Sequence, residues 1–396
     1  MTPRLGLALL PPLAALALAT PAAAQPNGVT DAEILFGMSA PFSGTEKEFG
    51  RQLRIGWELA FAAQNEAGGV NGRKLKLLPM DDGYEPARTQ TAMKELLEGR
   101  KVFAVVGNFG SATAAVSVPY ANEKGVLLYA AYSGANLLRN DPPDRFVFNL
   151  RASYAEETAA IVGYLVEVRR IPAWQIAVFA QEDAFGDAGF AGVAKAMRRY
   201  KRDPGLVLRV GYKRNTADVD EAVRALKHRA REIKAVVMVA TSKAAARFVE
   251  RVRDAKLDLV FTNVSPGAND LADDLAALGP GYADGVIMTQ VVPLPTSRAT
   301  AILKYQELLH RLAPDERPDF VSLEAYLSAR VLVEALQRAG RNLTTDSLID
   351  ALEGIHGLDL GIGVPVSFGP SEHQGSHKVW GTVIDGKGNF KPLDLQ

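Results

Sequence analysis

The sequence predicts an α/β protein built from two doubly wound, parallel-sheet lobes. Between Ile34 and about residue 290, apolar runs of strand length alternate with longer segments of helical period. The alternation starts afresh after residues 145–154, and past residue 292 it gives way to three consecutive helices. Strand, helix and strand in this order indicate a parallel sheet covered by helices on both faces. Two such sheets in series are therefore expected.

The first lobe is expected to begin with four strands and three helices. Two of these helices close on glycine, as helices commonly do. The predicted strands are residues 34–38, 74–80, 102–107 and 126–130, and the predicted helices are residues 51–68, 87–100 and 111–125.

The second lobe repeats the pattern with strands that are each followed by a helical segment. These strands are predicted at residues 175–180, 206–212, 235–240 and 259–263. The apolar run at 285–292 closes the alternating part of the chain, and helices follow at residues 299–312, 321–340 and 345–355. With no sheet of their own to cover, these helices are expected to lie back on the first lobe. The tail, residues 364–393, alternates apolar and polar residues and predicts a hairpin or meander.

The chain is therefore expected to cross between the lobes three times and to form a hinged clamp. The predicted first lobe comprises residues 25–150 and 293–356, and the second comprises residues 151–292 and 357–396. Ligands of open parallel sheets bind outside the carboxyl ends of the strands. Two such edges would face each other across a cleft between the lobes.

The amino terminus indicates export. Residues 1–24 have one basic residue, an apolar stretch and an Ala22-Ala23-Ala24 run, which predicts a signal peptide cleaved after Ala24. No later segment approaches the roughly 20 apolar residues of a membrane anchor. The sequence contains no cysteine, so no disulfide is expected. Its 45 basic residues equal its 45 acidic ones, so nucleic-acid binding is not expected. A freely diffusing, monomeric protein of the periplasm is predicted.

Two short stretches place small polar residues directly after strands. Residues 107–120 read GNFGSATAAVSVPY and residues 130–139 read AAYSGANLLR. Free backbone N–H groups and hydroxyls at a helix start can hold a carboxylate or another polar oxygen. Ser111, Thr113 and Ser133 are also ordinary helix-capping residues, so each one alone fits either role.

These segments, in this order and spacing, resemble the substrate-binding proteins of ATP-driven importers of the branched-chain amino acid type, with the type I periplasmic binding fold. The resemblance covers nearly the whole mature chain, from ILFGMSAPFSG and VVGNFGSATA through FNLRASY to VSLEAYLSARVLVEALQRAG. It implies a small-molecule ligand held between the lobes and an inner-membrane permease complex as partner. It also implies a set of ligand-binding positions, namely Ser43, Gly44, Thr45, Phe109, Ser111, Ala112, Thr113, Tyr132, Ser133, Gly134, Tyr154, Phe185, Ser242 and Ser265.

The sequence departs from relatives that bind α-amino acids in two of these loops. Those relatives usually have a threonine where this chain reads Tyr132-Ser133-Gly134, and an acidic residue where it reads Asn263-Val264-Ser265. An acid there would pair with a ligand ammonium, whose burial without a partner costs several kcal/mol. A plain zwitterionic amino acid is therefore less expected, and the aromatic residues of these loops favour an aromatic, aliphatic or otherwise weakly charged ligand. The predicted ligand is amino-acid-like or an aromatic or apolar carboxylate. Packing of the aromatic rings inside the lobes is the alternative role for each of them.

Other polar clusters are assigned structural roles. Asp81 and Asp82 are expected to cap the next helix, and Glu182 and Asp183 to lie in a solvated loop. His373 and His377 lie in a glycine and serine loop without the glutamate of a zinc motif, so no metal or other cofactor is expected. The run RRYKR at residues 198–202 closes a helix, where positive charge is favourable.

No enzyme motif is present. The sequence has no G-x-S-x-G elbow, no Walker loop and no G-x-G-x-x-G after the first strand, so catalysis is not expected. Two uses of a binding fold remain open: capture of a solute for an ABC importer, or service to a periplasmic sensor or a non-ABC efflux or lipid transport system.

Overall fold

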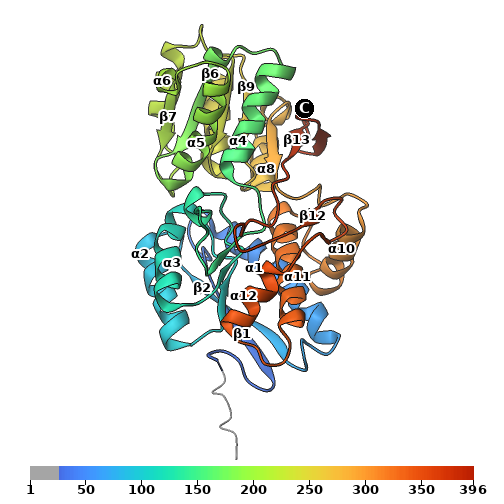
Figure 1. The fold of residues 1–396 in the computed structure, drawn as a ribbon. Helices are drawn as coiled ribbons and strands as arrows, with labels where there is room; N and C mark the ends of the chain where they lie inside the picture. Colours follow the sequence, from blue (N-terminus) through green and yellow to red (C-terminus); the bar gives the residue numbers. More distant parts are fainter. Residues whose placement is uncertain (1–25) are drawn as a thin grey trace, which may run out of the picture.

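The computed structural model describes residues 26–396 and has two α/β lobes stacked one on the other (Figure 1). The predicted signal peptide, residues 1–24, lies outside the described residues. The mixed α/β architecture with two parallel-sheet lobes agrees with the fold class expected from the sequence.

The first lobe is built on a five-stranded parallel sheet in the order β2-β1-β3-β4-β5. Its strands are β1 (Glu33–Ala40), β2 (Lys74–Asp81), β3 (Ala104–Val106), β4 (Leu128–Tyr129) and β5 (Val147–Phe148). The apolar runs at 34–38 and 74–80 lie within β1 and β2, whereas β3 and β4 are shorter than expected.

Helices cover both faces of this first sheet. They are α1 (Lys47–Glu66), α2 (Pro86–Lys94) with a π-helical turn (Glu95–Gly99), α3 (Ser111–Lys124), α10 (Thr300–Leu312), α11 (Phe320–Ala339) and α12 (Thr345–Glu353). On one face Trp57 of α1 meets the Tyr129 ring edge to face. On the other face Met93 and Val118 pack with Leu128. The three late helices thus belong to the first lobe, as their lack of intervening strands suggested.

Helices α1 and α11 approach each other closely. A Cβ on Gly56 would lie 2.1 Å from the Ser322 carbonyl oxygen, so only glycine allows this approach.

The second lobe has a seven-stranded sheet in the order β14-β13-β10-β9-β8-β6-β7. Its strands are β6 (Ile176–Gln181), β7 (Arg209–Tyr212), β8 (Ala235–Val239), β9 (Val260–Asn263), β10 (Ile287–Gln290), β13 (Trp380–Ile384) and β14 (Phe390–Leu393). The first five are parallel, and β13 and β14 form an antiparallel hairpin at the edge. The parallel part repeats the winding order of the first lobe.

The second sheet is also sandwiched between helices. They are α4 (Tyr154–Gly163) with a π-helical turn (Tyr164–Val168), α5 (Ala184–Arg199), α6 (Asp220–His228), α7 (Ser242–Asp254), α8 (Ala268–Ala277) and α9 (Pro280–Ala283). Single 3-10 turns occur at Asn136–Leu138, Ala173–Gln175 and Pro204–Leu206. On one face Phe179 of β6 stacks on Phe248 of α7 at 4.0 Å, and on the other Val178 packs with Val193 of α5.

Three chain segments join the lobes. Residues 149–153 run from β5 to α4, residues 291–299 run from β10 to α10, and residues 375–379 run into β13. Two of them lie side by side, because Asn149 N donates to the His373 carbonyl at 2.9 Å and Gly375 N donates to the Asn149 carbonyl at 2.7 Å. The predicted three-crossing connection is therefore present.

The tail corrects one expected boundary. The sequence placed all of residues 357–396 in the second lobe, but the small hairpin of β11 (Leu358–Asp359) and β12 (Pro365–Val366) lies against the first. Arg330 of α11 donates to the Leu360 carbonyl at 3.2 Å, and Phe368 meets Phe148 of β5 edge to face. Burial of these apolar side chains in the first lobe holds the segment there, and only β13 and β14 join the second lobe.

Candidate ligand site between the lobes

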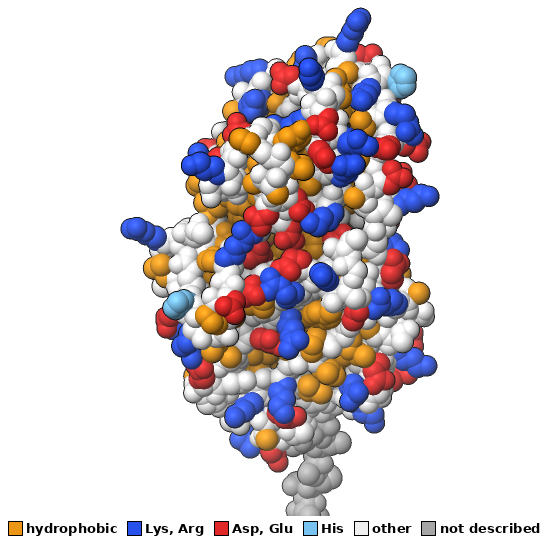
Figure 2. Space-filling view, turned by 180° about the vertical axis from the view of Figure 1, so that it is seen from behind, with side chains coloured by type: hydrophobic (Ala, Val, Ile, Leu, Met, Phe, Trp, Pro, Cys, Tyr) orange, Lys and Arg blue, Asp and Glu red, His pale blue; other side chains and the backbone are white. Residues whose placement is uncertain are grey.

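The two lobes are closed on each other where the carboxyl ends of their strands meet. At the centre, Gln181 at the end of β6 donates from Nε2 to the Tyr84 hydroxyl of the first lobe at 3.0 Å. At the edges, Arg214 pairs with Glu85 at 2.9 Å, and Arg317 pairs with Asp273. Figure 2 shows acidic and basic side chains interspersed across the middle of the molecule, at the level where the lobes meet.

On the first-lobe side, the two glycine and hydroxyl loops lie next to each other. Phe109 and Tyr132 form a parallel bridge, and the Ser111 and Ser133 hydroxyl oxygens are 2.8 Å apart in a buried hydrogen bond. Ser111 begins α3 directly after Gly110, whose φ of 93° favours glycine. The structure therefore brings together two loops that the sequence singled out separately.

Aromatic rings line this side. Phe109 stacks on Tyr132 with centroids 6.0 Å apart, meets Tyr84 edge to face at 4.9 Å, and contacts Phe49 of α1 at 4.7 Å. All four rings are buried. They form a continuous apolar wall beside the paired serines.

On the second-lobe side, Tyr154 and Phe185 contact each other with centroids 4.9 Å apart. Each stands at a capped helix start: Ser153 and Glu156 form a capping box on α4, and Asp183 accepts from Phe185 N at 2.9 Å on α5. Tyr154 N donates to the Gly134 carbonyl at 2.8 Å, and a Cβ on Gly134 would lie 2.5 Å from that nitrogen. Glycine is thus required where this loop meets the second lobe.

A buried arginine lies between the two sides. Arg151, in the first crossing, is 1% exposed, and its guanidinium lies over the rings of Tyr132 at 4.7 Å and Tyr154 at 5.4 Å. Its Nη2 donates to the Ser265 hydroxyl and to Glu157 at 3.5 Å. Its Nε and Nη1 have no hydrogen-bond partner among the described residues.

Two buried glutamates flank this arginine, one from each lobe. Glu157 of α4 is fully hydrogen-bonded, accepting from Ser265 N at 2.8 Å and from the Thr289 hydroxyl at 2.7 Å. The carboxylate of Glu324 on α11 forms an ion pair with Arg151 Nη1 at 3.6 Å and accepts no hydrogen bond within residues 26–396. Burial raises the pKa of Glu324 to about 7, although Arg151 opposes the shift. We call Arg151, Glu157, Glu324, Ser265 and the rings of Tyr132 and Tyr154 the interlobe site.

Comparison with known proteins identifies the family. Residues 33–389 match the family described as periplasmic binding protein. The chain belongs to the periplasmic binding protein family. This confirms the resemblance drawn from the loop sequences.

Individual relatives support the same assignment for this binding protein. The crystal structure of a possible leucine/isoleucine/valine-binding protein from Rhodopirellula baltica superimposes with a TM-score of 0.88, at 35% identity over 94% of this chain and 99% of that one. An amino acid binding protein of Pseudomonas aeruginosa is 27% identical over 78% of this chain and 80% of its own length. The branched chain amino acid ABC transporter structure from Thermus thermophilus with bound valine shares the fold, with a TM-score of 0.79 at 19% identity over 91% and 95% of the two chains.

The structure separates the predicted site residues into two groups. Phe109, Ser111, Ala112, Tyr132, Ser133, Gly134, Tyr154, Phe185 and Ser265 are buried at or beside the interface of the lobes. Among the others, Gly44 and Thr45 are exposed, and the Ser43 hydroxyl donates to Asp81 at 2.6 Å. Thr113 and Ser242 are buried, but their hydroxyls donate to the carbonyls of Gly110 and Gly267, both at 3.0 Å.

Sequence reasoning missed the charged residues of the interlobe site. It also missed two uncharged residues near the lobe interface: Gln181 ends β6 and Thr241 lies two residues beyond β8, so position at a strand end was a usable signal for them. Arg151 follows β5 inside the quoted segment FNLRASY, and the same signal applies. Glu157 and Glu324 are helix residues, and the one hint was a charge at position 324 within a strongly apolar helix.

Glu182 is exposed, as expected, but the other three acidic residues of the two pairs have different roles from those expected. Glu85, not Asp81 or Asp82, precedes α2 as its N-cap residue. Asp81 accepts from Phe42 N and Ser43 N, and Asp82 accepts from the Ser39 hydroxyl at 2.6 Å, so both hold the loops around β1 and β2. Asp183 is not in a solvated loop either, because it caps α5 and lies 3.4 Å from Arg214.

Both histidines of the tail lie in the loop between β12 and β13, as expected. His373 is buried, stacks on Phe148 at 3.7 Å and lies 3.2 Å from Glu353, so it is a core residue of the first lobe. His377 is exposed and pairs with Glu156 at 2.7 Å. Within residues 26–396 no cluster of three or more metal-ligating side chains occurs, and no helix is long and apolar enough to span a membrane.

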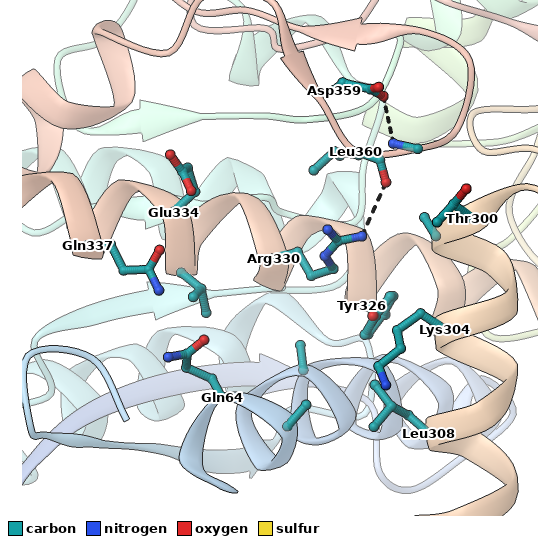
Figure 3. A pocket seen from close by; sticks show the side chains of 15 residues that line it. Gln64, Thr300, Lys304, Leu308, Tyr326, Arg330, Glu334, Gln337, Asp359 and Leu360 are labelled. Atoms are coloured by element: carbon teal, nitrogen blue, oxygen red, sulfur yellow. Dashed lines mark hydrogen bonds between the residues drawn. The ribbon is translucent and has the colours of Figure 1, made fainter. Parts of the chain in front are cut away.

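A further pocket lies away from the interlobe site. It measures about 690 Å³ and opens between α1, α10, α11 and the β11–β12 hairpin (Figure 3). Arg330 crosses it to reach the Leu360 carbonyl, and the Gln64 side chain that lines it donates to the Gly69 carbonyl at 2.6 Å. Arg330 thus helps to join the tail to the first lobe, whereas Gln64 holds the turn that follows α1.

Proposed function

We propose that this periplasmic binding protein captures a small solute between its lobes and delivers it to an inner-membrane ABC importer. The main support for this proposal is that polar and aromatic groups from both lobes converge on Arg151, whose hydrogen-bond donors are only partly used. Family membership supports a binding role. We infer that the chain acts as a monomer, without catalysis or cofactor. We also infer that it is exported to the periplasm and that its signal peptide is cleaved after Ala24.

The ligand that suits this site is amino-acid-like or an aromatic or apolar carboxylate. Phe109, Tyr132 and Tyr154 supply apolar surface, while Ser111 and Ser133 supply hydroxyls near the start of α3. Such a mixture of apolar walls and a few convergent polar groups is typical of small-molecule sites. The relatives named as amino acid binding proteins support the same class.

Capture requires the lobes to open and close. The hydrogen bond from Gln181 to Tyr84 and the ion pair of Arg214 with Glu85 exist only when the lobes are together. A ligand shifts the population toward the closed state only if it contacts both lobes. The interlobe site meets this requirement, since Tyr132 belongs to the first lobe and Ser265 to the second.

A thermal-shift screen of the exported chain tests capture. The panel contains branched-chain, aromatic and acidic amino acids, benzoate, phenylacetate, polyamines and a sterol. A ligand at 100 times its dissociation constant adds about 2.7 kcal/mol to stability and should raise the melting temperature by several degrees. A shift with an amino acid or carboxylate supports the proposal, and no shift with any compound contradicts it.

Uptake by cells tests delivery. A strain lacking this gene should lose uptake of the identified radiolabelled solute and regain it when the gene is restored. Unchanged uptake alongside tight binding would exclude the importer role and favour a sensory one.

A further inference from the structure

Only one of the three guanidinium nitrogens of Arg151 has a hydrogen-bond acceptor among the described residues. Arg151 is 1% exposed, and a buried donor without a partner costs about 1–3 kcal/mol. One of its terminal nitrogens, Nη2, is used by Ser265 and Glu157, whereas Nε and Nη1 have no acceptor. The nearest acid to Nη1, Glu324, lies 3.6 Å away, beyond hydrogen-bond distance.

Arg139, a partly buried arginine nearby, has a different set of contacts. Arg139 donates from Nε to Gln374 at 2.6 Å, from Nη1 to the carbonyls of Ser133 and Ala135, and from Nη2 to the Arg151 carbonyl at 3.0 Å. All three of its nitrogens are used, as expected of a structural arginine. Arg151 therefore differs from Arg139, because two of its nitrogens have no hydrogen-bond partner.

The free donors lie among the groups of the proposed capture site. The guanidinium lies over Tyr132 of the first lobe and Tyr154 of the second, and Nη2 contacts Ser265. Arginine is always charged in proteins, and hydrogen bonds from it to a carboxylate are about twice as strong as neutral ones. An anionic oxygen between the lobes would satisfy these donors and link both lobes at once.

We infer that Arg151 binds the carboxylate of the solute through its unpartnered donors and thereby selects carboxylates over the corresponding uncharged amides. This inference rests on the proposed function, and it deepens that function by naming the residue that sets the ligand class. It also accounts for the absence of an acid at Ser265, since that hydroxyl and Glu157 orient the arginine from the second lobe.

Glu324 distinguishes two sources of the carboxylate. An α-amino acid brings an ammonium group that can face Glu324, which has no hydrogen-bond partner among the described residues. A plain carboxylate brings a second negative charge toward Glu324, so its binding should take up a proton there. The two sources therefore differ in how binding depends on Glu324.

Calorimetric titration of matched ligand pairs tests the inference. The probes are L-leucine and L-leucinamide, L-phenylalanine and L-phenylalaninamide, and phenylacetate and phenylacetamide. The wild-type chain should bind the best carboxylate about 100-fold more tightly than its amide, which corresponds to about 2.7 kcal/mol. In Arg151→Gln this preference should fall to less than about fivefold, because affinity for the carboxylate drops while affinity for the amide changes little.

The preference ratio separates ligand contact from a structural role. Arg317→Gln removes another arginine at the interface of the lobes, and it should weaken both members of a pair equally. An equal loss of both members in Arg151→Gln would overturn the inference. If Arg151→Gln does not fold, Arg151→Lys provides the test: it should weaken the carboxylate about tenfold more than the amide, since lysine lacks the planar donor set.

The remaining outcomes separate this inference from the proposed function. Wild-type binding of amides or other uncharged compounds alone would overturn the role of Arg151 and leave solute capture intact. No binding of any probe or panel compound would contradict both. Glu324→Gln should weaken an amino acid at least about tenfold while leaving phenylacetate unchanged or bound more tightly, and no effect on either would remove Glu324 from the site.

Discussion

Gln181 and Tyr84 join the two lobes through a buried hydrogen bond of 3.0 Å. The Gln181 amide is itself held by the Tyr212 hydroxyl, which donates to Oε1 at 3.1 Å. The first lobe therefore binds to a side chain that the second lobe has already fixed. This relationship makes closure sensitive to a single hydroxyl.

Removing that hydroxyl should weaken ligand binding. Tyr84→Phe leaves the Gln181 amide without its interlobe partner, which costs about 1 kcal/mol and should raise the dissociation constant about fivefold. Tyr129→Phe is the matched control, because the Tyr129 hydroxyl donates to Ser328 within the first lobe and should affect stability alone. Titration calorimetry measures both, and equal dissociation constants for Tyr84→Phe and wild type would contradict this role.

The aromatic and hydroxyl groups of the site should contribute directly to affinity. Tyr154→Ala removes a ring that contacts Phe185 and Arg151, and Ser133→Ala removes the partner of Ser111. Each change should weaken binding at least tenfold, about 1.4 kcal/mol. Unchanged affinity in both variants would move the ligand away from this interface.

His373 should matter for stability and not for binding. Its ring stacks on Phe148 at 3.7 Å and its Nδ1 lies 3.0 Å from the Val147 carbonyl, inside the first lobe. His373→Ala should lower the free energy of unfolding by about 2 kcal/mol through the cavity and the lost contacts. Denaturant unfolding measures this, and a weaker ligand affinity at full stability would be the contrary result.

Ligand affinity should decrease as pH rises from about 5 to about 7, because of Glu46. Burial raises the pKa of Glu46 from 4.5 to about 7 in the closed structure, where Thr241 of the second lobe hydrogen-bonds to it. A carboxyl whose pKa is higher in the closed state takes up a proton on closing, so closing costs more as pH rises through this range. Glu46→Gln should remove most of this dependence, and an unchanged pH profile in the variant would contradict it.

The pair of His377 and Glu156 should stabilise the fold only in a limited pH range. The hydrogen bond from His377 raises its pKa above 6.5, so this contribution is full below pH 6.5 and is lost as pH rises through the raised value. Burial alone would raise the pKa of Glu156, but hydrogen bonds from His377, Ser153 and Gln374 lower it from 4.5 to about 2, so its contribution is lost below pH 4.5.

The difference in melting temperature between wild type and His377→Ala should therefore be largest between about pH 4.5 and 6.5. An exposed pair of this kind contributes at most about 1 kcal/mol, so the shift will be small. A difference that is constant from pH 4 to pH 9 would show that the ion pair has no part in it.

The tail shows where sequence patterns stop being informative. Alternating apolar residues correctly indicated extended segments, but the same alternation occurs in β12 on the first lobe and in β13 on the second. The pattern states that one face is buried and does not say against which lobe. Only the packing of Phe368 on Phe148 decides it.

The sequence by itself determined the two-lobed α/β fold, the three crossings and the two separate loops at Ser111 and Ser133, because periodicity, glycine and hydroxyl residues act locally on the backbone. The tertiary structure alone decided that Arg151, Glu157 and Glu324 meet. Arg151 comes from a crossing, and the two glutamates come from helices of opposite lobes. The sequence does not indicate whether a charged helix residue faces water or the other lobe. Burial between closed lobes is a property of their approach, and it leaves Nε and Nη1 of Arg151 without a hydrogen-bond partner among the described residues.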